Sequence, residues 1–289
     1  MTGRRRRRSR QASSDAIDRQ GVASFEGRFG QPKFAPVVVV IAAYQEETTI
    51  GPVLDAVPTR CCGLAIDTLV VVDGATDATA DLARDRGVYV CVCDVNRGQG
   101  AALRLGYALA RRYGARFVVT TDADGQYDSS QLGRLLDPLV THRADFVTGS
   151  RWLGDQATTD RVRRAGSRFF AGVTSVLTGQ HLTDTSFGFR AMKADLTGAV
   201  TLRQPQYQSA ELLIEVLAHG GRVLEVPMTM RARAAGQTKK GTNLTYGARY
   251  AAVLLRTWCR HWRHWTCRWT SKGRRPTAVD GITRRRRVG

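Results

Sequence analysis

Two aspartates separated by a single residue, Asp122 and Asp124, are the pair in this sequence that most directly suggests chemistry. They follow a run of apolar and β-branched residues at 117–121. In an extended or turning backbone, this spacing lets both carboxylates reach one hard cation, and Mg²⁺ or Mn²⁺ prefers such oxygen ligands. The sequence Asp-Ala-Asp-Gly also suits a simple turn, so the surrounding elements must decide between the two.

The elements around this pair predict a parallel sheet. Continuous apolar runs predict strands, and the segments between them have helical periodicity. The predicted strands are 37–41, 69–72, 88–93 and 117–121, and the predicted helices are 48–57, 77–86 and 98–113. This alternation is typical of βαβ units, in which ligands bind beyond the carboxyl ends of the strands.

Acidic residues follow three of the four predicted strands, at 46–47, 73–77 and 122–124. Their mutual repulsion at one sheet edge would be relieved by a bound cation. The loop Asn-Arg-Gly-Gln-Gly at 96–100 precedes a predicted helix, where glycines allow close backbone approach and the helix N-terminus favours an anion. This loop lacks the lysine spacing of a P-loop and is equally consistent with a glycine-rich turn.

The net charge of +19 is concentrated at the two ends of the 289-residue chain. Residues 1–33 carry +6 and residues 256–289 carry +10, which leaves only +3 for the segment between them. A nearly neutral body argues against a domain whose whole surface holds nucleic acid. We expect 1–34 to be a disordered basic arm and 271–289 a disordered basic tail.

No run approaches 18 apolar residues, and no apolar stretch follows the arginines at 4–8, so neither a spanning helix nor a signal peptide is expected. The six cysteines are too few and too irregular for a disulfide scaffold, which favours reduced thiols in a cytoplasmic protein. Two cysteines and two histidines lie within 259–267, but on one helix they would point in different directions and make a poor zinc site.

Six segments in this order resemble glycosyltransferase family 2, and within it the dolichyl-phosphate and polyprenyl-phosphate sugar synthases. The segments are 41–47, 71–77, 96–101, 122–126, 149–151 and 184–190. The resemblance covers roughly 36–240 and implies a GT-A fold of the α/β class over 35–240, with a mostly parallel nucleotide-binding sheet flanked by helices.

The resemblance also implies roles for individual residues. It implies that the nucleotide sugar is bound by Ala42, Tyr44, Glu46, Asp73, Asp122, Ala123, Asp124, Arg151 and Lys239. The first three of these would line the pocket for base and ribose, and the fourth would also contact the nucleoside. Asp122, Asp124 and Gln126 would hold the Mg²⁺ or Mn²⁺ that bridges the donor diphosphate. Arg151 and Arg190 would face phosphates of donor or acceptor.

The implied function is metal-dependent, inverting transfer of a single sugar from a UDP- or GDP-sugar to a polyprenyl phosphate or other membrane-associated acceptor. A hydroxyl acceptor would need a general base, for which Asp184 is the candidate, whereas a lipid phosphate is already an anion that Arg190 and Lys239 could position. One alternative is transfer to a soluble metabolite or saccharide. Another is a nucleic-acid-binding protein on a degenerate enzyme fold, which the intact motif at 122–126 disfavours, so no specific nucleic acid is expected as partner.

Several positions depart from the family pattern or have two interpretations. Ala42, Gln45 and Val72 stand where the family usually has Pro, Asn and Asp, which leaves the identity of the base open. The Gln-x-x-Arg-Trp signature of processive synthases is absent, which favours transfer of one sugar. The basic segment 231–239 is either a loop that closes over the pyrophosphate or a solvated charge run, and Glu211 matches a family acidic position but could simply brace its helix.

The segment 241–270 is predicted to form an amphipathic helix. Its four tryptophans fall within roughly a 60° sector, and three arginines project from the opposite side. They are Trp258, Trp262, Trp265 and Trp269, and Arg256, Arg260 and Arg263. Indole rings favour the membrane interface and arginines favour anionic headgroups, so we expect peripheral attachment to the inner face of the membrane. The alternative is that the tryptophans pack on the protein's own core.

Overall fold

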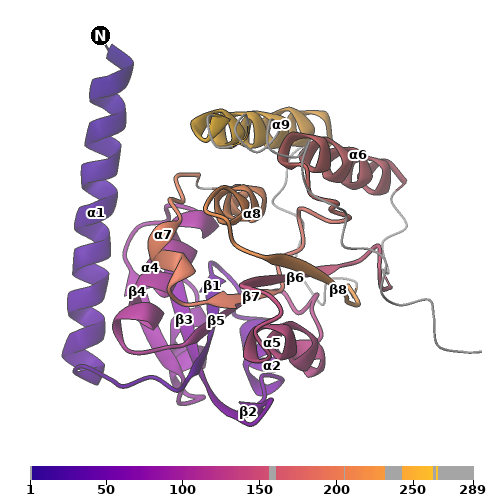
Figure 1. The fold of residues 1–289 in the computed structure, drawn as a ribbon. Coiled ribbons are helices and arrows are strands. Elements are labelled where there is room, and N and C mark those ends of the chain that lie inside the picture. The colour runs from indigo at the N-terminus through magenta and orange to yellow at the C-terminus, as the bar shows by residue number, and fades with distance from the viewer. Residues whose placement is uncertain (1, 156–160, 205, 232–242, 263–264, 266–289) are drawn as a thin grey trace, which may run out of the picture.

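A mixed β-sheet forms the centre of the protein, with helices on both of its faces (Figure 1). The computed structural model describes residues 2–155, 161–204, 206–231, 243–262 and 265. Within them the strand order is β2-β3-β1-β5-β7-β6-β8, and β4 pairs with β3. The strands are β1 (Val37–Ala43), β2 (Arg60–Cys61), β3 (Leu64–Asp73), β4 (Tyr89–Cys93), β5 (Phe117–Asp122), β6 (Phe146–Ser150), β7 (Arg190–Lys193) and β8 (Val223–Pro227).

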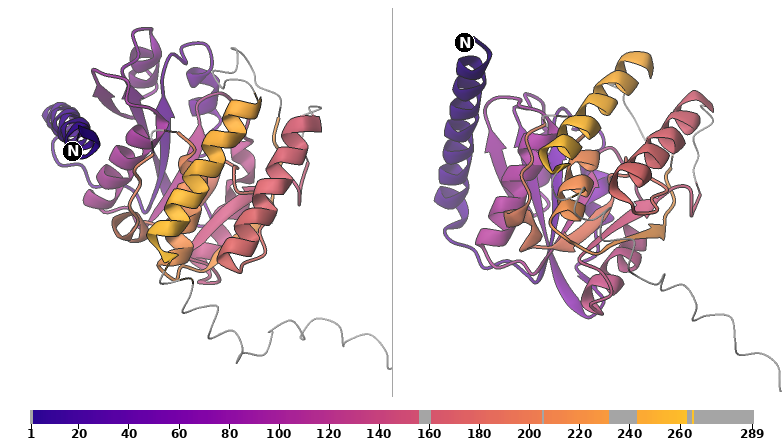
Figure 2. Two further views of the ribbon diagram at one scale, coloured as in Figure 1. Left: turned by 90° about the horizontal axis from the view of Figure 1, so that it is seen from above. Right: turned by 45° about the horizontal axis from the view of Figure 1, so that its top comes forward.

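The helices cover the sheet as two layers. Helices α1, α4, α8 and α9 contribute to the core on one face, and α2, α3 and α5 to the core on the other. Their bounds are α1 (Thr2–Phe29), α2 (Ile50–Asp55), α3 (Thr79–Arg84), α4 (Gln99–Arg112), α5 (Leu132–Val140), α6 (Arg161–Thr178), α7 (Leu196–Ala199), α8 (Gln208–Ala218) and α9 (Asn243–Arg260), and a 3₁₀ turn spans Ser129–Gln131. Helix α6 lies beside α9 (Figure 2).

Strand β1 shows why the apolar runs form a sheet that is buried on both faces. Val38 and Val40 point into the core that α4 and α8 share, while Val37, Val39 and Ile41 point into the core of α2 and α5. β1 pairs in parallel with β3 and β5, and β3 pairs in parallel with β4. The four predicted strands and the parallel arrangement are therefore confirmed, and the carboxyl ends of these strands share one sheet edge.

Strand β7 runs antiparallel to both of its neighbours, β5 and β6. It returns the chain to the middle of the sheet, and β8 then adds in parallel to β6. At one end of this half, the Asp145 carboxylate accepts hydrogen bonds from Lys193 at 2.6 Å and from Arg222 at 2.9 Å. These contacts link the three strands. The α/β fold class is confirmed, and β7 lies as an antiparallel strand within a mostly parallel sheet, while the short β2 pairs antiparallel with β3 at its edge.

Residues 1–34 differ from the expected disordered arm, because Thr2–Phe29 form helix α1. Val22, Phe25 and Phe29 lie on one side of this helix, and together with Ile17 they pack on the core at β4 and α4. Only 1% of Phe25 is exposed. The arginine-rich composition obscured these apolar residues in the sequence, although the spacing of Val22, Phe25 and Phe29 is that of one side of a helix.

An aromatic cluster attaches the C-terminal half of α1 to the body. The ring centroids of its contacting pairs lie between 4.7 and 6.3 Å apart. The members are Phe25, Phe29, Phe34, Tyr89 and Tyr113. Such contacts supply large apolar burial and specific ring geometry, so this half of the helix is an integral part of the fold.

The predicted C-terminal helix is present as α9, but its tryptophans do not share one exposed face. The Trp258 indole N–H donates to the carbonyl of Leu177 at 2.8 Å, and Trp265 is buried. Trp262 is 52% exposed, and Trp269 lies outside the described residues. The expectation of a common membrane-facing stripe is therefore wrong for Trp258 and Trp265, because α9 turns them toward α6 and the core.

Arg260 also differs from the expected solvent-facing cation. It pairs with Glu211 at 3.2 Å and with Glu215 at 2.6 Å, and so joins α9 to α8. Among the described residues, no helix is long and apolar enough to cross a membrane.

Candidate functional site

The Asp-Ala-Asp motif lies at the carboxyl end of β5, as the sequence predicted. Asp122 is the last residue of the strand, and one of its carboxylate oxygens accepts a hydrogen bond from the Gln99 side-chain amide at 2.7 Å. Ala123 is buried, and Asp124 is 5% exposed. The Asp124 carboxylate accepts the backbone N–H of Gln126 at 3.1 Å, which fixes the turn.

These two carboxylates fit a cation that takes its other ligands from a substrate. Within the described residues, no group of three or more His, Cys, Asp or Glu side chains could enclose a metal ion. Mg²⁺ is commonly held by one or two carboxylates together with substrate phosphates and water, so a two-carboxylate set suits it. The Gln126 side-chain amide donates to the carbonyl of Arg231 at 3.4 Å, and its role as a metal ligand stays a prediction.

Tyr127 lies beside both carboxylates, and the sequence analysis missed it. Its hydroxyl accepts the N–H of Gly188 at 2.8 Å, and its ring meets that of Phe187 at 4.8 Å. Burial raises the pKa of the phenol, with further rises from Asp122 and Asp124 and a lowering by Arg151. The phenol therefore stays protonated. Its position directly after Asp-Gly-Gln was the available signal.

Gly188 explains how the segment 184–190 reaches the Asp-Ala-Asp motif at 122–124. A Cβ atom at this position would lie 2.8 Å from a carboxylate oxygen of Asp122 and equally close to the Tyr127 hydroxyl. Only glycine allows this backbone approach. The 184–190 segment is thereby held against the end of β5.

Asp184 and Arg151 form a tight ion pair next to this motif. The Arg151 guanidinium contacts the Asp184 carboxylate at 2.6 Å, and the backbone N–H of Ser186 donates to the same carboxylate at 3.1 Å. The Asp184 side chain is fully enclosed, whereas 14% of the Arg151 side chain is exposed. The guanidinium also lies 5.8 Å from the centroid of the Phe187 ring. In this geometry Asp184 holds Arg151 in place.

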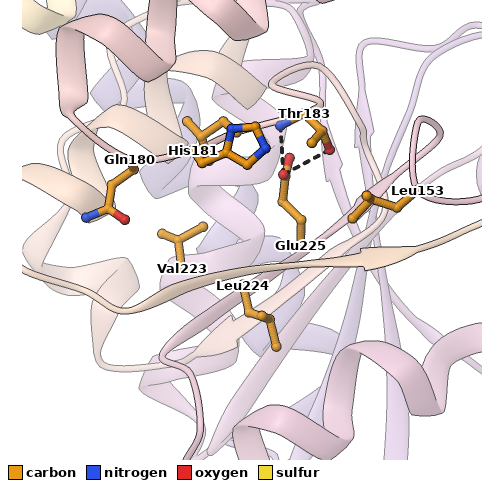
Figure 3. A pocket seen from close by; sticks show the side chains of 8 residues that line it. Leu153, Gln180, His181, Thr183, Val223, Leu224 and Glu225 are labelled. Carbon is orange, nitrogen blue, oxygen red and sulfur yellow. Dashed lines mark hydrogen bonds between the residues drawn. The ribbon is translucent and has the colours of Figure 1, made fainter. Parts of the chain in front are cut away.

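Glu225 on β8 holds the loop that contains Thr183 and Asp184 (Figure 3). Its carboxylate accepts the backbone N–H groups of Thr183 and Asp184 at 2.7 and 2.8 Å. Burial raises the Glu225 pKa, and these two N–H groups lower it in part. Glu225 forms one wall of a pocket of about 250 Å³ that His181 and Val223 also line. Glu225 is a second supporting residue that the sequence analysis missed.

The residues predicted to hold a nucleoside lie at the ends of β1 and β3. Ala42 is within β1, and Tyr44 follows it with 38% of its surface exposed. The Glu46 backbone N–H donates to the Thr79 hydroxyl at 2.9 Å. The Gln45 side-chain oxygen accepts the N–H of Thr76 at 3.0 Å. Gln45 thus links the loops after β1 and β3.

Asp73 at the end of β3 organises the loop between β4 and α4. One of its carboxylate oxygens accepts the backbone N–H groups of Arg97 and Gly98, each at 2.7 Å. Burial raises the Asp73 pKa, and both N–H groups oppose that rise. Gly74 has a φ of +72°, and a Cβ there would lie 2.2 Å from the Asn96 nitrogen. The close contact between the loop after β3 and the loop between β4 and α4 therefore requires glycine at position 74.

Arg190 lies in the core of the sheet and does not reach the surface. It is 1% exposed, and one guanidinium N–H donates to the Ser209 hydroxyl at 2.8 Å. Among the described residues, its Nε has no hydrogen-bond partner. Arg190 pairs with Thr120 across β7 and β5, two positions before Asp122. Arg190 is therefore a buried cation near the end of β5 that carries the Asp122 and Asp124 carboxylates.

Glu211 and Lys239 are two further residues that the sequence singled out. Glu211 is buried and pairs with Arg260, as expected for a residue that braces its helix. Lys239 and the rest of the basic loop beyond Arg231 lie outside the described residues.

The sequence profile described as glycosyl transferase family 2 matches residues 38–200, more than half of the chain. The chain belongs to glycosyltransferase family 2. A dolichyl-phosphate hexose transferase of Haloferax volcanii is 35% identical over 206 residues, which are 71% of this chain and 87% of that protein. An undecaprenyl-phosphate mannosyltransferase of Micrococcus luteus is 31% identical over 218 residues, with coverages of 70% and 86%. This family 2 chain is therefore a glycosyltransferase.

The solved structures agree on the fold of this family 2 member. Glucosyl-3-phosphoglycerate synthase from Mycobacterium tuberculosis, in complex with Mn²⁺, UDP-glucose and phosphoglyceric acid, superposes with a TM-score of 0.63. It is 23% identical, and the match covers 78% of this chain and 80% of that one. This likeness supports the GT-A fold.

Proposed function

We propose that this glycosyltransferase moves a single sugar from a nucleotide sugar to a polyprenyl phosphate, with Mg²⁺ or Mn²⁺ held by Asp122 and Asp124. The observation that carries the proposal is the contact of the two-carboxylate motif with the 184–190 segment. There the enclosed Asp184 carboxylate aims Arg151 beside the motif. The named relatives act on dolichyl and undecaprenyl phosphates, which supports the acceptor class.

The donor side of the reaction requires stabilisation of a leaving diphosphate. A divalent ion at Asp122 and Asp124 would neutralise charge on this group as a Lewis acid. The Arg151 guanidinium would add charge-assisted hydrogen bonds to phosphate oxygens. The Tyr127 hydroxyl stays protonated and could donate a hydrogen bond in the same place. The bond between the anomeric carbon and the diphosphate oxygen breaks, and the nucleoside diphosphate leaves with the electron pair.

The acceptor side does not require a base when the acceptor is a phosphate. A phosphate oxygen already carries negative charge and would form the new bond to the anomeric carbon from the opposite face, with inversion. Asp184 is closed off by Arg151, Ser186 and its own loop, so we assign it to positioning of Arg151. Arg190 lies too deep for direct contact in this structure, and its charge would act on the phosphates from below.

We propose further that α6 and α9 bring the site to a membrane surface. Exposed apolar side chains lie on this helix pair, at Phe169 and Val176 of α6, at Leu255 of α9 and at Trp262. Among the residues of the pair whose exposure is described, the exposed arginines are Arg164, Arg168, Arg249 and Arg256. Apolar side chains flanked by cations suit the interface of an anionic bilayer. This surface replaces the tryptophan stripe that the sequence suggested.

Replacement of Phe169 or Trp262 by Glu should weaken binding of the full-length protein to phosphatidylglycerol-containing liposomes about tenfold, because apolar burial is lost and like charge is added. Sedimentation with liposomes at low salt measures this. Ala56→Glu, which adds the same charge at the exposed end of α2, is the matched control and should bind as the wild type does. Equal binding by all four proteins would contradict the membrane surface.

A screen of UDP- and GDP-sugars tests the proposed reaction directly. The purified protein is incubated with each donor and Mn²⁺, with and without a polyprenyl phosphate, and release of nucleoside diphosphate is measured. We expect release from one donor that requires both the metal and the lipid phosphate. Release that depends on a soluble acceptor and ignores the lipid would replace the polyprenyl phosphate assignment with the alternative acceptor class.

A further inference from the structure

Arg97 connects helix α1 to the nucleotide-binding side of the sheet. It lies in the loop between β4 and α4, and its side chain is only 8% exposed. Its guanidinium contacts Asp18 of α1 at 2.5 Å and Asp73 of β3 at 3.4 Å. It also donates to the carbonyl of Ser14 in α1 at 3.1 Å. A nearly buried cation is thus held between two carboxylates, one of which comes from the N-terminal helix.

The loop that carries Arg97 reaches the metal motif within two residues. Asp73 accepts the backbone N–H groups of Arg97 and Gly98, and the next side chain, Gln99, donates to Asp122 at 2.7 Å. Hydrogen bonds and the intervening backbone of residues 97–99 therefore connect Asp18 to the first aspartate of the motif. A shift of the Arg97 side chain would be transmitted to the backbone that fixes Gln99.

Helix α1 is a firm support for Asp18. Phe25 is buried in the aromatic cluster, and Glu26 binds the Tyr113 hydroxyl at 2.5 Å and Arg112 at 2.7 Å. Asp18 also lies 3.4 Å from Arg104 of α4. The family 2 match begins at residue 38, so α1 precedes the matched region.

We infer that Asp18 is a positioning residue for binding of a nucleoside diphosphate, and that α1 belongs to the architecture of the donor site. Asp18 balances the charge of Arg97 and keeps Asp73 free to hold the loop through its backbone N–H groups. Without Asp18, the guanidinium turns its remaining donors to Asp73 and competes with those N–H groups. This inference rests on the proposed function, since it concerns the donor of that reaction.

The test compares Asp18→Asn with Glu26→Gln in the full-length protein. Asp18→Asn removes the charged contacts of α1 with Arg97 and Arg104, and Glu26→Gln removes the one with Arg112, so of these two carboxylates only Asp18 contacts Arg97. Titration calorimetry with UDP and with GDP, each with Mn²⁺, measures binding without turnover. We expect Asp18→Asn to weaken binding of the preferred nucleotide about tenfold, the scale of one charged hydrogen bond. Glu26→Gln should stay within about twofold of the wild type, and Asp18→Glu should restore most of the affinity.

Hydrogen–deuterium exchange gives a second readout that needs no ligand. The Arg97 and Gly98 amides donate to Asp73, so the peptide covering 94–103 should exchange faster in Asp18→Asn and at the wild-type rate in Glu26→Gln.

The outcomes separate this inference from the proposed function. If the wild type binds neither nucleotide, the proposed donor chemistry fails. If the wild type binds and Asp18→Asn binds equally, with unchanged exchange, the positioning role is overturned. Loss of affinity in Glu26→Gln that equals the loss in Asp18→Asn would also overturn it, because attachment of α1 alone would then account for both.

Discussion

Asp124→Asn is expected to reduce sugar transfer at least about a hundredfold while the protein keeps its fold, the scale of losing one key electrostatic contact in a reaction site. Asn is nearly isosteric with Asp, and its side-chain oxygen still accepts the N–H of Gln126 that fixes the turn. Only the negative charge that favours a divalent cation is removed. Initial rates over a range of Mn²⁺ concentrations measure the effect, and we expect partial recovery at high metal.

Asp137→Asn is the control for this experiment. Asp137 is an exposed carboxylate on α5 whose partner is Arg143, on the surface. Its replacement removes the same charge without touching the motif, so the rate should stay within about twofold of the wild type. Wild-type activity of Asp124→Asn, or full activity of the wild type in excess chelator, would contradict the assignment of the metal site.

Arg190→Met should lower transfer about a hundredfold and yet leave the protein at least as stable as before. Arg190 is a buried cation that donates to the Ser209 hydroxyl, so it carries a desolvation cost, and apolar replacements of buried charges are often neutral or stabilising by about 1–4 kcal/mol. We expect the charge to serve the reaction instead, because Arg190 lies next to the proposed binding site for the diphosphate. Thermal denaturation and initial rates, measured on the same samples, separate the two effects.

Arg190→Lys distinguishes charge from shape at this position. Lysine keeps the positive charge but loses the planar fork that reaches Ser209. We expect an intermediate rate, higher than that of Arg190→Met. A marked drop in the melting temperature of Arg190→Met, with activity lost only in proportion to the unfolded fraction, would show that Arg190 serves the fold.

The donor half of the protein could be predicted from sequence because its signals are local. Strands β1, β3, β4 and β5 are apolar runs, and β3 and β5 end in the site residues Asp73 and Asp122. The antiparallel strand β7 gave no such signal. It has only four residues, and its first residue is the buried Arg190, so neither length nor pattern marks it as a central strand.

Long-range contacts explain what the sequence could not supply. The enclosure of Asp184 depends on Glu225, 41 residues further along the chain, and the burial of Trp265 depends on how α9 lies on the core. Helix α1 was hidden by its arginine content, although Val22, Phe25 and Phe29 lie on one side of it. In each case tertiary packing determined the position of the residue or helix, and local composition had suggested a different one.

The strand order also sets the sequence of events as the chain is synthesised. Strands β4, β3, β1 and β5 all come from residues 37–122 and pair through short connections, so they can form early. The far edge of β5 then stays open until Arg190–Lys193 arrive, nearly 70 residues later, with β6 and β8 beyond them. An open strand edge is a template for pairing with other chains. We therefore expect nascent chains that stop before β7 to aggregate through β5, and the proposed reaction site, which lies at this seam, to assemble only after β7 has been added.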